Sequence, residues 1–138
     1  MGETMHVDGS CYCGAIRFAA EIDPKRVGLC HCTDCQTFSS SAFRASVMVP
    51  DERFELLEGT PAVFEKTAES GARRDLRFCA RCGTHLYGTG GGGGRVFHSV
   101  RVGALAQRDQ LAPVAQVWCR SAVPWLGNLA ELPRVETQ

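Results

Sequence analysis

Several features that would assign this chain to a common class are missing from its 138 residues. Lys and Arg (15) balance Asp and Glu (15), so the formal net charge is zero and no overall field favours nucleic acid or an acidic membrane surface. The first eight residues include acidic and polar side chains where a secretory signal would be basic and then apolar. No later run approaches the roughly 18 apolar residues of a membrane helix. We therefore expect a cytoplasmic protein without a membrane partner.

A sustained helical period is also missing, because no window longer than about ten residues repeats apolar side chains every three or four positions. Alternation with period two is present instead, as in Ile16, Phe18, Ala20 and Ile22. Further strands are expected at 43–50, 54–57, 61–66, 73–78, 85–87, 95–102 and 115–119, and a short helical turn within 122–133. The sequence predicts one domain, residues 1–138, of mainly β class, with small sheets tied together by metal.

The glycine-rich segment 88–94 lacks the features of a phosphate-binding loop. Neither the lysine nor the hydroxyl residue of such a loop follows it, and no helical pattern comes after it. We expect a flexible hairpin loop between two strands.

Cysteine is abundant, with eight residues in the chain. In a reducing compartment, closely spaced cysteines are more often metal ligands or catalytic groups than disulfides. Seven of the eight fall in three clusters: Cys11/Cys13, Cys30/Cys32/Cys35 and Cys79/Cys82. The first pair precedes a predicted strand with both sulfurs on one face, and the last pair, followed by Gly83, is typical of a zinc knuckle.

Tetrahedral zinc favours a division of these cysteines into four and three, because a structural site is closed by four protein ligands and a catalytic site keeps one position open. The closed, structural site would use the two outer pairs, Cys11, Cys13, Cys79 and Cys82. The open, catalytic site would use the central cluster, Cys30, Cys32 and Cys35. A thiol bound at the open position would lose its proton near neutral pH and become a nucleophile.

The central cluster also allows other interpretations. His31, His85, His98 or Cys119 could complete a second closed and purely architectural site. Iron–sulfur binding by the same cysteines is a further alternative. A disulfide is disfavoured because Cys-x-Cys closes with difficulty, and a thioredoxin-type pair is disfavoured because no helix is predicted after the Cys-x-x-Cys motif.

Two single residues beside these motifs have weaker signals. Cys119 follows Trp118 and is expected to be a small buried hydrophobe. His31 lies between two ligands, so its side chain is expected to point away from the sulfurs, in a supporting, substrate-facing or inert position.

Four motifs in a fixed order resemble a known family. They are residues 9–18, 30–35 and 78–86, which contain the three cysteine clusters, and 123–125, which contain a Pro-Trp pair. Together they resemble the glutathione-dependent formaldehyde-activating enzyme family, which also includes centromere-protein-V-like proteins, over about residues 9–132. The resemblance implies several coiled antiparallel sheets and two zinc sites, divided as above. It also implies addition of the glutathione thiol to formaldehyde, giving S-hydroxymethylglutathione, by a carbon–sulfur lyase.

The segment after Cys35 departs from the family pattern. Basic residues and a glycine usually precede a small residue and Phe there, whereas residues 36–43 of this chain contain neither. If an anionic tripeptide such as glutathione binds, Arg44, Arg73 or Arg74 would have to supply the positive charge.

We therefore predict a zinc-dependent carbon–sulfur lyase that adds a small thiol such as glutathione to formaldehyde or a related carbonyl, or catalyses the reverse reaction. The alternative is a non-catalytic, zinc-stabilised binding module for protein or nucleic acid, as centromere-protein-V-like relatives suggest. Nucleic acid is disfavoured because the net charge is zero and only residues 73–77 form a short basic run.

Overall fold

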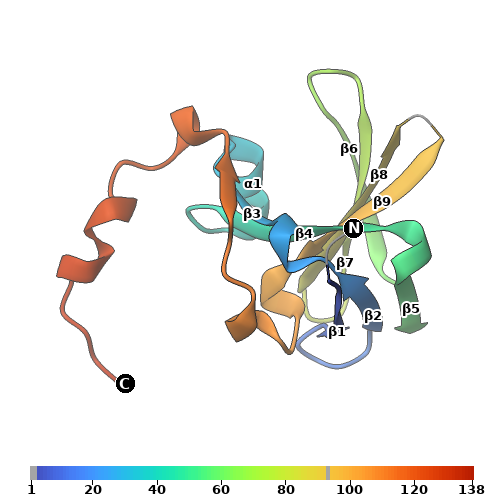
Figure 1. Ribbon diagram of the computed structural model, residues 1–138, viewed down its shortest axis with the longest axis horizontal. Helices are drawn as coiled ribbons and strands as arrows, with labels where there is room; N and C mark the ends of the chain where they lie inside the picture. The colour runs from blue at the N-terminus through green and yellow to red at the C-terminus, as the bar shows by residue number, and fades with distance from the viewer. Residues whose placement is uncertain (1–2, 93) are drawn as a thin grey trace.

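A computed structural model describes residues 3–92 and 94–138, and in this part of the chain most regular elements are strands of two β-sheets (Figure 1). The smaller sheet has the antiparallel order β1 (Met5–Ser10), β2 (Arg17–Ile22), β5 (Phe54–Glu58). The larger sheet has the order β10 (Ala115–Val117), β3 (Val27–Cys30), β4 (Arg44–Pro50), β9 (Arg95–Arg101), β8 (His85–Gly92), β7 (Arg73–Phe78), β6 (Ala62–Thr67). Strand β10 pairs in parallel with β3, and the other pairs are antiparallel. The predicted mainly β class is confirmed.

Among the described residues, helical structure is limited to α1 (Thr33–Ser39) and short 3-10 turns. The turns are Pro24–Arg26, Asp51–Arg53, Val102–Ala104, Arg108–Gln110, Cys119–Ser121 and Leu126–Glu131. Helix α1 begins after Cys32, whose Sγ accepts the N–H of Cys35 at 3.3 Å, and ends at Ser39, which is followed by Ser40 with φ 51°. None of these helices, within the described residues, is long and apolar enough to cross a membrane.

One hydrophobic core joins the inward faces of both sheets. Phe18 and Ile22 of β2 are buried together with Val47 and Val49 of β4. The ring of Phe18 also lies edge-on to Tyr87 of β8, with centroids 5.6 Å apart. Burying a side chain of this size contributes about 1.5–3 kcal/mol, so the period-two alternation seen in the sequence fixes which face of each strand turns inward.

The predicted strands are present, but the glycine-rich segment differs from the expectation. Strand β8 continues through Gly88–Gly92 and pairs with β9, so most of the expected loop is strand; Gly93 lies outside the described residues. A Cβ at Gly88 would lie 3.0 Å from Nη2 of Arg101, and one at Gly90 would lie 2.9 Å from Cδ of Arg74. These glycines therefore make room for arginine side chains that cross the strand.

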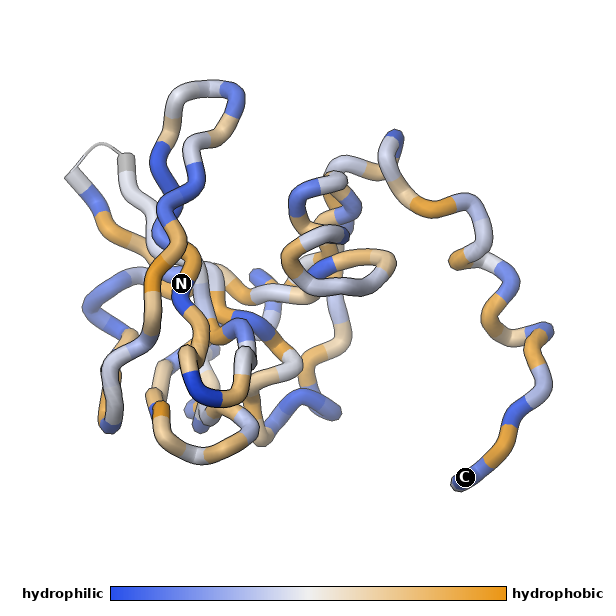
Figure 2. Tube along the Cα trace, turned by 180° about the vertical axis from the view of Figure 1, so that it is seen from behind, coloured by the Kyte–Doolittle hydropathy of each residue, from blue (hydrophilic) through white to orange (hydrophobic). Residues whose placement is uncertain are grey.

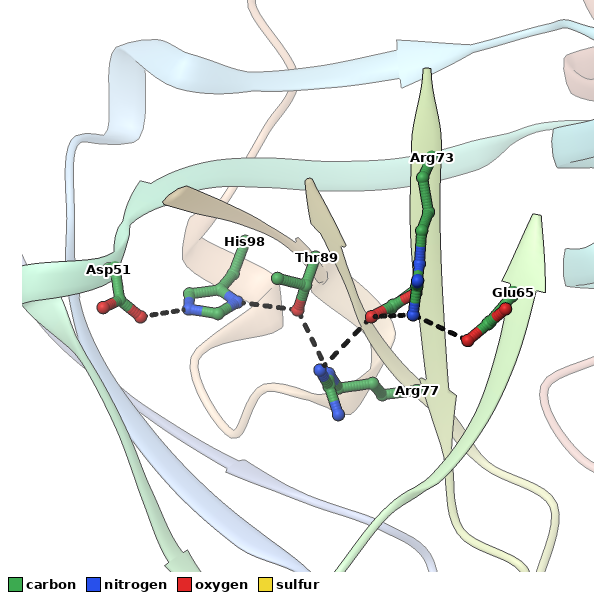
Figure 3. A network of polar contacts seen from close by, with 7 residues as sticks. Asp51, Glu65, Arg73, Arg77, Thr89 and His98 are labelled. Carbon is green, nitrogen blue, oxygen red and sulfur yellow. Dashed lines mark hydrogen bonds and ion pairs between the residues drawn. The ribbon is translucent and has the colours of Figure 1, made fainter. Parts of the chain in front are cut away.

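A chain of polar side chains crosses the larger sheet (Figure 3). Buried His98 donates from Nε2 to Oδ1 of Asp51 (2.8 Å), and its Nδ1 lies 3.0 Å from the hydroxyl of Thr89. Nε of Arg77 donates to that hydroxyl oxygen at 3.1 Å. Because an arginine N–H can only donate, the Thr89 O–H is free to donate to His98. The ring nitrogens of His98 are thus satisfied by a structural network.

The segment after β10 leaves the two sheets and lies apart from them in both views (Figures 1 and 2). Large apolar side chains along it are exposed, among them Trp118, Trp125, Leu129 and Leu132. Its final turn, Leu126–Glu131, is the short helical element expected within 122–133.

Candidate metal centres

The two outer cysteine pairs converge, as the sequence predicts. The Sγ atoms of Cys11, Cys13, Cys79 and Cys82 all lie within 4.8 Å of one another. Cys13 Sγ lies 3.6 Å from that of Cys11 and 3.8 Å from that of Cys79. Sulfur ligands 2.3 Å from a tetrahedral zinc ion lie about 3.8 Å apart. The four thiols therefore fit a closed tetrahedral metal site.

Two similar turns bring these pairs together. Each ends in a glycine with positive φ, Gly14 at 80° and Gly83 at 82°. The N–H of each glycine donates to the carbonyl of the first cysteine of its turn, Cys11 (3.2 Å) or Cys79 (2.8 Å). The N–H of Ile16 donates to Sγ of Cys11 at 3.3 Å. Both turns thus use glycine for a conformation that other residues rarely adopt, and backbone dipoles face the sulfurs.

Thr84 links the two turns and favours thiolate at this cluster. Its hydroxyl oxygen accepts the N–H of Tyr12 at 3.0 Å and lies 3.2 Å from Sγ of Cys82. Hydrogen bonds from the side chain and then the backbone of Thr84 lower the pKa of Cys82 to about 5. A thiolate is the form that binds a metal ion.

The central cluster is formed where β3 ends and α1 begins. Cys30 is the last residue of β3, Cys32 caps α1, and Cys35 lies in its first turn. Their three Sγ atoms lie within 4.8 Å of one another. Among the residues that the structure describes, no fourth His, Cys, Asp or Glu belongs to this group. The arrangement can hold a metal ion through three thiols.

The three thiols of this group differ in acidity. Burial is the main cause that raises the pKa of Cys35 to about 12, and it exceeds the opposite effect of Arg44. Burial also opposes ionisation of Cys32, but the backbone N–H of Cys35 and the neighbouring thiols lower its pKa. One thiol therefore ionises before the others, and a bound cation would favour the thiolate form of all three.

His31 supports the segment between the cysteines rather than facing a substrate. Its side chain is 2% exposed, and Nε2 lies 2.8 Å from Oε1 of Gln116 on β10. The backbone N–H of His31 donates to the carbonyl of Val117 at 3.1 Å. The side-chain amide of Gln36 donates to the carbonyls of both His31 (2.8 Å) and Ser121 (3.0 Å). Strand β10 and the turn after it thus fix the backbone that presents the sulfurs.

The other proposed fourth ligands are not in the group. His98 bonds to Asp51 and Thr89, as described above, and His85 lines a separate cleft. Cys119 is exposed, and its thiol donates to the carbonyl of Gln116 at 3.7 Å. The expectation that Cys119 is buried is wrong, because its 3-10 turn lies on the surface of the protein.

A cleft of about 480 Å³ opens beside Cys30 and Cys35. Its apolar lining includes Leu29, Met48, Leu76 and Phe97. Its charged lining, as far as the structure describes the chain, consists of five cations, Arg26, Arg44, Lys66, Arg74 and Arg101. By contrast, a larger cleft of about 720 Å³ beside Cys11 has charges of both signs, Asp8, Arg17, Glu58 and Arg108. The electrostatic field of the smaller cleft therefore favours an anion.

Two of the three arginines considered from the sequence line this cleft. They are Arg44 and Arg74, whereas Arg73 pairs with Glu65 at 2.6 Å and with Asp75 at 2.9 Å.

Sequence reasoning missed Arg101, the most buried charge in the cleft. The residue is 8% exposed, and its Nη1 donates to the carbonyl and hydroxyl oxygens of Ser99 (both 3.0 Å) and to the hydroxyl of Ser46 (3.3 Å). Burial, and then the nearby Arg44, lower the pKa of Arg101 to about 9. The available signal was a charged residue between Val100 and Val102, within an apolar stretch.

A second cleft, of about 500 Å³, shares Arg44 and Arg101 with the first. Phe38, Phe43 and His85 line it. Burial, followed by Arg101 and Arg44, lowers the pKa of His85 below its usual 6.5. Arg44 and Arg101 therefore line both the cleft beside Cys30 and Cys35 and the cleft beside His85.

Comparison with known proteins assigns the family. The model of the family described as glutathione-dependent formaldehyde-activating enzyme matches residues 6–121. This chain belongs to that family. The resemblance seen in the motifs is thereby confirmed.

One sequence relative and one solved structure show how far the likeness of other proteins to this chain extends. A Schizosaccharomyces pombe protein named an uncharacterized lyase is 34% identical over 85 residues, which cover 58% of this chain and 55% of that protein. The match thus spans about half the length of the relative. A crystal structure of a Rhodobacter sphaeroides protein has a TM-score of 0.63 at 16% identity, covering 80% of this chain and 99% of that one. At such an identity the likeness shows the fold alone.

The cysteine groups of this family member suit the zinc that the resemblance implies. Thiolates are soft ligands, and tetrahedral sulfur ligation is typical of zinc or of iron–sulfur centres. The four-thiol group has the spacing for a closed site, and the three-thiol group leaves one tetrahedral position for another ligand. Iron–sulfur binding stays an alternative for the same residues.

Proposed function

We propose that this protein is a zinc-dependent carbon–sulfur lyase that adds glutathione or a related small thiol to formaldehyde or another small carbonyl, and that catalyses the reverse. The observation that carries the proposal is the group of three thiols, two of which, Cys30 and Cys35, line a cleft whose charged lining is cationic. Membership of the family and the lyase name of the yeast relative support the same reaction class.

The two cysteine groups would have different roles. Cys11, Cys13, Cys79 and Cys82 would hold a structural zinc ion that joins segments distant in the sequence. Cys30, Cys32 and Cys35 would hold a catalytic one. A zinc ion bound there would supply Lewis acidity, which lowers the pKa of a thiol that reaches it.

The reaction requires no oxidant or reductant. The substrate sulfur gives a lone pair to the carbonyl carbon and forms a C–S bond, while the C=O π electrons move to oxygen. The oxygen then takes up one proton, which balances the proton that the thiol has released. The reverse reaction breaks the C–S bond and returns the free thiol and the aldehyde.

The protein's own residues bind and orient the substrate in this scheme. Leu29, Met48 and Leu76 give the cleft an apolar lining that reduces access of water. Arg44 and Arg101 attract an anionic thiol and favour its thiolate form. Holding the sulfur near the carbonyl carbon makes the addition effectively intramolecular.

The test is the rate of exchange between glutathione and S-hydroxymethylglutathione in formaldehyde solution, measured by ¹³C NMR with zinc-loaded protein. We expect the wild type to accelerate the exchange above the spontaneous rate and the Cys32→Ser variant not to do so. No acceleration by a wild type that carries zinc in both sites would refute the proposal.

A zinc-stabilised protein-binding module is the second candidate function. The exposed apolar side chains after β10, among them Trp118, Trp125 and Leu129, favour it. Nucleic acid is a poorer partner, because Arg73 and Arg77 in the basic run are both paired with Asp75. Truncation after Ala122 would abolish protein binding in this case and leave thiol exchange unchanged.

A further inference from the structure

A buried arginine without a carboxylate partner lines the cationic cleft, and the acidic groups that act on it are the thiols of Cys35 and Cys30. All hydrogen bonds that the structure gives for the guanidinium of Arg101 are made by Nη1, and their acceptors on Ser46 and Ser99 are neutral. Within residues 3–92 and 94–138 no carboxylate lies within ion-pair distance of it. A buried charge is costly when it is unpaired, so this position favours a ligand that brings the missing anion.

The guanidinium of Arg101 lies against a glycine in the wall of the cleft. Nη2 lies 3.0 Å from the position that a Cβ would take at Gly88, and Gly88 itself lines the cleft. The missing side chain at Gly88 therefore leaves the room that the guanidinium of Arg101 occupies in the wall of the cleft. The two serines bind Nη1 alone. The other two nitrogens, Nε and Nη2, therefore remain to receive a carboxylate as a pair of parallel donors.

Arg44 adds a second cation to the same place. It is half-buried at the start of β4, lines both clefts, and lies over the ring of Phe38 at 6.0 Å. The structure gives no carboxylate within ion-pair distance of it in the described part of the chain. Two guanidinium groups that repel each other bind an anion more strongly than either alone.

We propose that Arg101, assisted by Arg44, binds the carboxylate of the substrate and selects thiols that carry one over neutral thiols. The inference rests on the proposed function, since it assigns the thiol of the same substrate to the adjacent Cys30/Cys32/Cys35 group. A neutral thiol would bury Arg101 further without pairing it. The carboxylated thiol is preferred because it compensates this charge where solvent screening is weak.

The test compares two thiols of equal length, 3-mercaptopropionate and 3-mercaptopropanol, by calorimetric titration of the zinc-loaded protein near pH 7. We expect the wild type to bind the carboxylate about tenfold or more tightly than the alcohol. In Arg101→Gln the preference should fall to about twofold or less. Arg101→Lys should retain part of this preference, because the ammonium keeps the positive charge but lacks the paired N–H donors of the guanidinium.

Arg95→Gln is the matched control, because it removes the same charge from the exposed other end of β9. It should keep the wild-type preference, and thermal melting would check the fold of every variant. A wild type that binds both thiols equally would overturn the proposal, even if Arg101→Gln fails to fold. Adding acetate together with the neutral thiol tests whether a separate anion can pair with Arg101. If acetate restores tight binding of the neutral thiol, the carboxylate need not belong to the thiol and the proposal fails.

S-methylglutathione separates this proposal from the proposed function, because it keeps both carboxylates and lacks a free thiol. If it binds the wild type and loses about tenfold or more in Arg101→Gln while formaldehyde exchange is not accelerated, the carboxylate receptor stands and the lyase proposal fails. If exchange is accelerated and Arg101→Gln keeps the full preference for the carboxylate, the receptor fails and the lyase proposal stands.

Discussion

The two cysteine groups use the same kind of ligand in different surroundings. The four-thiol group is formed by two similar turns, one before β2 and one after β7, and so connects the smaller sheet to the larger one. The three-thiol group comes from six consecutive positions and lies beside a cleft whose described charged lining is cationic. The ligand type alone does not distinguish the groups. Their difference lies in which parts of the chain they join and which charges face them.

The largest expected effect is the loss of the four-thiol group. Cys79→Ser should abolish cooperative folding, because the apparent binding energy of a structural zinc ion, about 10–16 kcal/mol, is comparable with the whole stability of a domain. Circular dichroism on heating and zinc content per chain would measure it. Cooperative melting of Cys79→Ser near the wild-type temperature would show that the fold does not depend on the four-thiol group.

The matching change in the three-thiol group should have a smaller effect. Cys32→Ser should lose one zinc ion per chain and the thiol exchange while keeping a cooperative thermal transition, since its group joins no distant segments. Elemental analysis with the same melting experiment checks this expectation. An equal loss of fold in Cys32→Ser and Cys79→Ser would show that both groups are architectural.

A third variant tests the polar network of the larger sheet, which is independent of both cysteine groups. Thr89→Val removes the hydroxyl between His98 and Arg77 and should lower the free energy of unfolding by about 1–3 kcal/mol, because Nδ1 of buried His98 loses its partner. Urea denaturation measures it, and Thr67→Val, at an exposed end of β6, is the control. Zinc content should stay at the wild-type value in both variants, and a change in it would contradict the separation.

The smallest expected effect is a shift in the pKa of His85, which lines the second cleft together with Arg44 and Arg101. Burial and then Arg101 and Arg44 hold the pKa of His85 below 6.5, because each disfavours the imidazolium. Arg101→Gln removes one of the two cations, so the pKa of His85 should rise toward 6.5. NMR titration of the imidazole would show this, with exposed His6, whose pKa is raised mainly by Asp8, as the internal control. An unchanged His85 would mean that Arg101 does not act on this cleft.

Sequence patterns predicted those parts of the molecule that depend on local regularity. Period-two alternation located β2 and β9, because one buried face imposes it on such a strand. Cysteine spacing predicted both thiol groups, because the ligands of each pair or cluster are close neighbours in the chain. The metal-binding and catalytic roles of these cysteines stay predictions.

Elements that depend on distant contacts were missed. Helix α1 has seven residues and a cysteine cap, too short a segment to show a helical period. Strand β1 contains Gly9, which normally weakens a strand, but a Cβ there would overlap the ring of Phe18. The role of Arg101 depends on β4, β8 and β9 meeting at one place, and no local pattern records this.

The contact of His31 with β10 has a consequence for the order in which the protein assembles during synthesis. All four thiols of the first group exist once Cys82 has been added, whereas Gln116 and Val117, which fix His31 between the other sulfurs, are added more than thirty residues later. At about 5–20 residues per second this interval lasts several seconds. The growing chain therefore contains every thiol of the group that connects the sheets before it contains the residues that fix the backbone of the group beside the cleft.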